Sequence, residues 1–263
     1  MNLRFSRKQL GIPYAVFLIC FVVAPLLVVL YYAFTNGSGQ FTAGNFINFF
    51  TDENTIGTLC YSLVVAATVT VCCTLVAYPV AYILARSDIK KKNVLLVLFI
   101  APMWINFTLR VVALKEVLTM VEGNLAYHPF LNTVLGMTYD FLPFMILPLY
   151  TTLEKLDKSY LEAAADLGAS PVITFMKVTL PLSMPGLISG VTMVFLPSMT
   201  NYVILDMLYN STYIMGSLIG SYFHAYDWNS GSMISIVLLA IIFLVTWATN
   251  GFSEEETTRG AFL

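Results

Sequence analysis

The chain has 263 residues, of which 58% are apolar and only 11% are charged, and its mean hydropathy is +0.79. Soluble domains carry roughly 25% charged residues, so a water-soluble fold could not bury this much apolar surface. The net charge of −2 gives no indication of a nucleic-acid partner. We therefore predict a membrane protein.

Six apolar blocks follow one another along the chain. A hydrocarbon core of about 30 Å takes about 20 helical residues to cross. Because backbone amides in lipid must find partners within their own segment, such blocks are expected to be helices. The predicted spans are residues 12–34, 59–85, 93–113, 131–153, 186–209 and 232–250. We predict an all-α polytopic protein whose residues 1–263 form a single transmembrane domain.

Lysine and arginine are sorted to one side of these spans. Short cytoplasmic loops are enriched in these two residue types. Eleven of the 13 basic residues fall on the side that holds both termini, the connection at 86–92 and the connection at 154–185. We therefore predict that both termini lie in the cytoplasm.

The four cysteines lie in apolar stretches, and two of them, Cys72 and Cys73, are sequence neighbours. This spacing fits neither a disulfide framework nor a metal site. We predict that they are small apolar packing residues and that the chain holds no metal.

The predicted cytoplasmic segment 154–185 has the pattern of a compact helical unit. Asp157 can cap a short helix, and Gly168 can adopt the left-handed conformation that ends it. Ser170 and Pro171 suit the start of a second short helix, because proline is tolerated in a first turn. We predict a helix, a tight turn and a helix at the inner membrane surface, a shape that fits a groove on a soluble partner.

The same segment resembles the EAA loop of bacterial ABC importer permeases. The pattern of that loop is E-A-A, three residues, G, nine residues, I, one residue and L-P. The matching residues, at the same spacing, are Glu162, Ala163, Ala164, Gly168, Val178, Leu180 and Pro181. Valine in place of isoleucine is the one departure, and it keeps a β-branched apolar side chain.

The resemblance implies a type I importer permease of the bacterial inner membrane, whose loop docks as a coupling helix in a cytoplasmic ATPase. Glu162 would offer a carboxylate to a basic group of the ATPase, and Ala163 and Ala164 would allow close approach. Gly168 would supply the sharp turn. Leu180 and Pro181 complete the candidate coupling residues.

The resemblance also implies partner chains: a second permease, two copies of the ATPase and an external substrate-binding protein. This chain contains no G-x-x-x-x-G-K-[ST] phosphate loop. We therefore expect ATP and Mg²⁺ to be bound by the ATPase subunits, no cofactor to be bound here, and the chain to be a transport subunit rather than an enzyme.

Four segments extend the resemblance to the spermidine/putrescine permeases, which implies a polyamine cargo. They are residues 78–86, 102–115, 142–170 and 179–190. Related permeases for other solutes share parts of these segments, so import of thiamine, an oxyanion or iron stays an alternative. An anion pathway would require basic residues in the spans, where Arg110 is the only one available.

A polyamine pathway should offer carboxylates for ammonium groups and aromatic faces for methylenes and cation–π contacts. Ionisable residues within a membrane are costly and are functional candidates. The candidates for the pathway are Asp206, Asp140, Trp104, Tyr202, Asn201 and Asn106. Two other interpretations stay open: Asp206 as an interfacial acid facing water, and Asp140 as a structural partner of Arg110 or of a neighbouring subunit.

Two other classes of protein are less favoured. A membrane-embedded enzyme needs a nucleophile and a base in adjacent spans, and no histidine lies within the core of a predicted span. A channel would have no use for a docking loop. A membrane-embedded enzyme or a channel should purify without a stoichiometric ATPase, whereas an importer permease should purify with one.

Overall fold

The computed structural model of the chain describes residues 11–87, 89–208 and 213–260, with side chains described as far as Trp247. Over these residues the regular structure is helical, apart from an isolated β-bridge between Thr35 and Phe41. The predicted all-α class is confirmed. Among the described residues, five helices are long and apolar enough to span a membrane, or up to six if a bent pair counts as one span.

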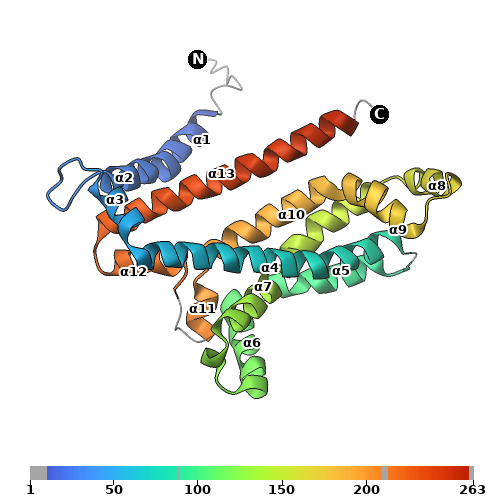
Figure 1. Ribbon diagram of the computed structural model, residues 1–263, viewed down its shortest axis with the longest axis horizontal. Helices are drawn as coiled ribbons and strands as arrows, with labels where there is room; N and C mark the ends of the chain where they lie inside the picture. Colours follow the sequence, from blue (N-terminus) through green and yellow to red (C-terminus); the bar gives the residue numbers. More distant parts are fainter. Residues whose placement is uncertain (1–10, 88, 209–212, 261–263) are drawn as a thin grey trace, which may run out of the picture. The chain divides into compact units, whose positions relative to one another are not determined.

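The chain divides into two compact units, and in the described chain the first comprises residues 11–58 and 218–241. Its first candidate span, Gly11–Ala33, contains a π-helical turn and is almost entirely free of buried residues, as expected for a helix that faces lipid. The elements of this unit are α1 (Gly11–Leu18), the π turn η1 (Ile19–Val23), α2 (Ala24–Ala33), α3 (Gly44–Thr51) and parts of α4 (Glu53–Arg86), α12 (Met215–His224) and α13 (Trp228–Gly260) (Figure 1).

Two asparagine side chains hold the end of the first span in place. The last carbonyl groups of a helix have no partner within the helix and must be satisfied by other groups. The Asn45 amide donates to the carbonyl oxygens of Ala33, at 3.0 Å, and Thr35, at 2.9 Å. The Asn229 amide donates to the carbonyl oxygen of Tyr32 at 3.1 Å. These bonds tie α2 to α3 and to the start of α13.

In the described chain the second unit comprises residues 59–87, 89–208, 213–217 and 242–260, and it carries every candidate site residue named above. Besides parts of α4, α12 and α13, its elements are α5 (Lys92–Ile100), the 3₁₀ turn η2 (Ala101–Trp104), α6 (Phe107–Glu122), the 3₁₀ turn η3 (Leu125–Tyr127), α7 (Pro129–Lys155), α8 (Ser159–Asp166), α9 (Pro171–Thr174), the π turn η4 (Phe175–Thr179), α10 (Leu180–Thr200) and α11 (Val203–Leu208).

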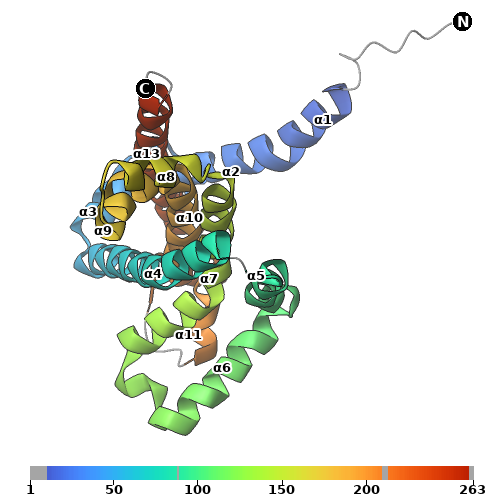
Figure 2. The same ribbon diagram turned by 90° about the vertical axis from the view of Figure 1, so that its right-hand side faces the viewer.

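The core of the second unit is the packing of α7 against α10, which lie side by side (Figures 1 and 2). Two glycines on α10 make the close approach possible. A Cβ atom on Gly186 would lie 2.5 Å from Thr152 Oγ1, and one on Gly190 would lie 2.5 Å from Met145 Sδ. Small residues at helix interfaces let backbones approach closely in membranes, where packing is the main force between helices.

Two of the predicted spans are interrupted. The sequence predicts a continuous helix over 93–113, whereas the structure bends by 99° between Lys92–Trp104 and Phe107–Glu122 (Figure 2). Pro102 lacks a backbone donor, and the Asn106 side chain accepts a hydrogen bond from the Thr108 amide at 3.0 Å and so starts a new helix. The predicted span 186–209 is also divided: α10 ends at Thr200, and a separate helix, α11, begins at Val203.

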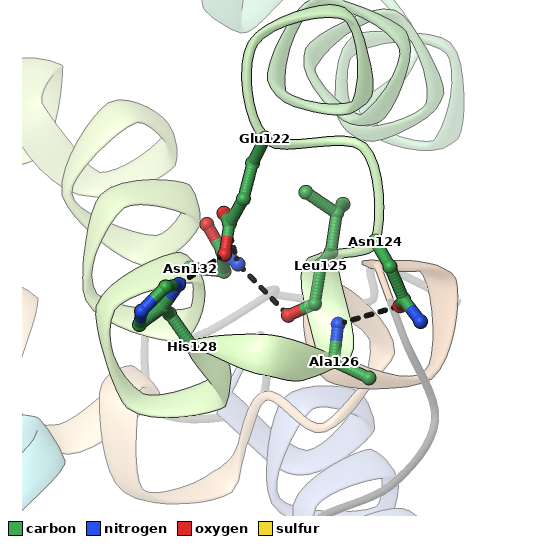
Figure 3. Close-up of polar contacts among 6 residues, drawn as sticks. All are labelled: Glu122, Asn124, Leu125, Ala126, His128 and Asn132. Carbon is green, nitrogen blue, oxygen red and sulfur yellow. Dashed lines mark hydrogen bonds and ion pairs between the residues drawn. The ribbon is translucent and has the colours of Figure 1, made fainter.

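Polar side chains fix the connection from α6 to α7 (Figure 3). Glu122, the last residue of α6, accepts a hydrogen bond from Asn132 Nδ2 at 2.9 Å and lies 2.5 Å from His128 Nδ1. Asn132 also donates to the carbonyl oxygen of Leu125 at 2.9 Å. The side chain of Asn132 is buried, so these bonds stabilise the turn that orients α6 relative to α7.

Candidate functional site

The segment 154–185 forms the first short helix and the tight turn that the sequence predicts. The second helix is predicted to be short, but it continues from Pro171 through η4 into α10, and Pro171–Thr200 is one candidate span of 30 residues. Asp157 Oδ1 accepts a hydrogen bond from the Ser159 amide at 3.0 Å, and this bond lowers the pKa of Asp157. Helix α8 ends at Asp166, and the turn after it contains Gly168, whose φ of 76° lies in the left-handed region and whose amide donates to the Ala165 carbonyl oxygen at 2.8 Å. Ser170 Oγ then accepts from the Ile173 amide at 3.4 Å, at the start of α9.

This unit presents apolar side chains that nothing in the described chain covers. The exposed fraction is 88% for Leu167, 71% for Val172 and 54% for Tyr160. Glu162 and Ala163 are exposed on the same short helix, while Ala164 is buried against the rest of the unit. Exposed apolar groups that are rimmed by polar ones mark interaction surfaces. Glu162, Ala163 and Gly168 thus lie on a surface that can bind another protein. The other two candidate coupling residues, Leu180 and Pro181, begin α10, where Leu180 packs against the core.

The structure places Asp140 in a buried ion pair between α6 and α7. Arg110 Nη2 lies 2.7 Å from Asp140 Oδ1, and the exposed fractions of the two side chains are 8% and 5%. The guanidinium also lies 5.9 Å from the centre of the Phe107 ring. Neither charge can be buried cheaply alone, so each stabilises the other. A cationic solute that reached Asp140 would have to compete with this guanidinium.

The remaining pathway candidates lie at the two helix breaks. Trp104, which is 76% exposed, and Asn106 flank the 99° bend. Asn201 and Tyr202 are half-buried at the break between α10 and α11. Asp206 is exposed on α11.

Helix α11 is held against α6 and α7 by close packing at Gly136. A Cβ atom there would lie 2.9 Å from Leu208 Cδ1 and 3.0 Å from Ile204 Cγ2. The structure therefore brings Asp140 and Arg110 into contact, and positions α11, which carries Asp206, beside the two helices that hold this pair. That any of these side chains faces a transport path stays a prediction.

Two structural features near the candidate residues escape sequence reasoning. One is the pair of helix breaks, between η2 and α6 and between α10 and α11. The only local sequence signals for these breaks are the prolines Pro102 and Pro197. The other is a contact between α4 and the segment that follows the coupling loop, centred on Phe175. Its signal is the spacing of Tyr78 and Tyr82, which puts two aromatic rings on one face of a helix.

Comparisons with known proteins agree with this architecture. The structure is similar to that of a bacterial ABC transporter involved in the import of the acidic polysaccharide alginate. The TM-score is 0.72, the identity is 13%, and the match covers 94% of both chains. The alginate ABC transporter in complex with a periplasmic protein bound to an alginate pentasaccharide gives a TM-score of 0.75 at 11% identity, covering 94% of this chain and 93% of that one. The chain therefore shares its fold with chains of these ABC transporters, and its candidate spans make it a multi-pass membrane protein.

Sequence relatives define the family. The family "Binding-protein-dependent transport system inner membrane component" matches residues 77–253, and the chain belongs to it. The spermidine/putrescine transport system permease protein PotB of Haemophilus influenzae is 34% identical over 275 residues, covering 95% of this chain and 96% of that protein. PotB of Escherichia coli K12 is also 34% identical, covering 75% of this chain and 79% of that protein. The chain is a transport permease rather than an enzyme.

Proposed function

We propose that this permease conducts polyamines, spermidine or putrescine, into the cell. The observation that carries the proposal is the 34% identity to a spermidine/putrescine permease along 95% of the chain. Carboxylates and aromatic rings within the second unit are the groups that a flexible polycation requires. Asp140 and Asp206 are the candidate carboxylates, and Trp104 and Tyr202 are the candidate aromatic surfaces.

The proposed complex contains four further chains. They are a second permease, which we expect to be PotC-like, two PotA-like ATPase subunits that bind ATP and Mg²⁺, and an external PotD-like substrate-binding protein. The exposed side chains of Leu167 and Val172 support docking of the loop in an ATPase groove, because they leave apolar surface without a cover in the described chain. Closure of the ATPases on ATP would move the loop and switch the pathway between its inward- and outward-facing states.

This arrangement requires both termini and the loop 154–185 to lie in the cytoplasm. The sorting of basic residues supports that orientation. In spheroplasts that carry the permease with its four native cysteines replaced, a cysteine introduced at Ala163 should react with a membrane-impermeant thiol reagent only after permeabilisation. Reaction in intact spheroplasts would contradict the orientation.

The identity of the solute is tested by ATP hydrolysis in the reconstituted complex. Proteoliposomes holding the permeases and ATPases receive the binding protein, with spermidine or putrescine in one set. Thiamine, an oxyanion or ferric iron takes their place in the others. We expect the polyamines alone to raise hydrolysis above the level seen with the empty binding protein. Stimulation by one of the other solutes, without an effect of polyamines, would assign the importer to that solute.

A further inference from the structure

One aromatic side chain connects the coupling loop to α4. Phe175 begins the π turn η4, directly after α9. Its ring meets the rings of Tyr78 and Tyr82 edge-on, with centroid distances of 5.5 and 5.9 Å and interplanar angles of 82° and 88°. Edge-to-face geometry is the favoured arrangement of aromatic pairs. Phe175 therefore contacts two tyrosines that lie one helical turn apart on α4.

A hydrogen bond fixes the same part of α4 to α10. Tyr78 Oη and Ser183 Oγ lie 2.7 Å apart, and both side chains are buried. Ser183 Oγ also donates to the carbonyl oxygen of Leu180 at 2.9 Å. Because a serine hydroxyl has one proton, Tyr78 is the donor to Ser183. The start of α10 is thus anchored to α4 at a defined point.

The segment between these two contacts departs from α-helical geometry. The Leu180 amide donates to the Phe175 carbonyl oxygen five residues earlier, which is the π-helical pattern. Within this segment Thr179 is fully buried, and its Oγ1 has no hydrogen-bond partner in the described part of the chain. Elsewhere in the second unit, buried Thr70 bonds the carbonyl oxygen four residues earlier at 2.7 Å. The π turn is therefore a locally less stable helical turn between two fixed contacts.

We propose that Phe175 is the positioning residue that passes movement of the coupling loop to α4. This inference rests on the proposed function, in which an ATPase moves that loop. The ring is held between two tyrosines, so a displacement of α8 and α9 pushes on α4 directly. The hydrogen bond of Ser183 holds the start of α10 in place, so α10 moves less than α8 and α9. The π turn between them deforms to accommodate the difference. Loop and helix are thereby linked at a side chain that lies outside the EAA residues.

The test is Phe175→Leu in the complete reconstituted complex. Leucine keeps much of the apolar volume but loses both edge-on ring contacts, and Phe175 does not belong to the exposed docking surface. Three quantities are measured: the amount of ATPase bound to the permeases, the rate of ATP hydrolysis, and the polyamine imported per ATP hydrolysed. The matched control is Phe144→Leu on α7, a ring with an edge contact to Phe141 at 6.3 Å.

We expect Phe175→Leu to bind ATPase and hydrolyse ATP like the parent, while import per ATP falls roughly fivefold or more, as expected for the loss of two aromatic contacts. Phe144→Leu should keep the parental ratio. An unchanged ratio for Phe175→Leu, or a loss of uptake only in proportion to assembled complex, would overturn the inference. If Phe175→Leu fails to assemble, Tyr82→Leu is judged by the same criteria.

The two proposals fail in different ways. If the proposed function is wrong, the parent complex itself takes up no polyamine or binds no ATPase. If only the present inference is wrong, the parent complex transports polyamine and Phe175→Leu transports it with the same ratio to ATP.

Discussion

Removing the Arg110–Asp140 pair one charge at a time should destabilise the protein more than removing both charges. The two side chains are less than a tenth exposed and lie 2.7 Å apart. Asp140→Asn leaves a buried guanidinium unpaired, and Arg110→Gln leaves a buried carboxylate unpaired. Each such loss costs about 3 kcal/mol or more. That is about a hundredfold in the ratio of folded to unfolded protein. The double variant buries no charge and should recover most of the loss.

The assay is denaturation of the purified permease in detergent micelles, followed for the parent, both single variants and the double variant. A coupling free energy of about 2 kcal/mol or more between the two changes is expected. Additive losses, or single variants as stable as the parent, would refute the interpretation of this contact as a stabilising ion pair.

The same four proteins separate a structural role of Asp140 from a role in transport. Polyamine uptake by the double variant at the parental level would mean that the carboxylate serves packing alone. Lost uptake in a double variant of recovered stability would show that transport needs at least one of the two charged side chains.

Three further changes have expected outcomes. Gly186→Ala should lower the melting temperature, because its Cβ would lie 2.8 Å from the Pro148 carbonyl oxygen. The overpacking cost of about 1–3 kcal/mol exceeds the gain of about 1 kcal/mol in helix propensity. A Cβ atom on Gly168 would meet open space, but alanine at a φ of 76° costs about 1–2 kcal/mol in the turn. Gly168→Ala should therefore reduce ATPase co-purification at an equal amount of permease. Asp206→Asn should reduce polyamine uptake at an equal protein level, and parental uptake would remove Asp206 from the proposed pathway.

The sequence predicts the helical class and the coupling loop well, because both depend on local chemistry. Apolar block length decides which segments can cross lipid, and Gly168 lies in the turn after α8 with the positive φ expected of its position. The cap at Asp157 and the start of the second helix after Ser170 also agree with the sequence. These features depend on residues that are neighbours in the chain.

The helix breaks and the side-chain contacts are harder to predict because they depend on residues far apart in the chain. Pro102 alone does not distinguish a mild kink from the 99° bend. The contact of Phe175 with Tyr78 joins helices that are separated by almost a hundred residues, and neither side chain identifies the other from the sequence. From the sequence, pairing of Asp140 with Arg110 is one of several possibilities, and only the geometry identifies the ion pair.

The most direct test of the coupling-loop account is photo-crosslinking in membranes that contain the complete importer. A photoreactive amino acid replaces Ala163 in one variant and Ser38 in another; Ser38 lies between the first two predicted spans, 12–34 and 59–85, on the side opposite the predicted cytoplasmic termini. We predict that position 163 crosslinks to the ATPase subunit and position 38 does not. A crosslink to the ATPase from position 38, or none from position 163 in a complex that still imports polyamine, would contradict the account.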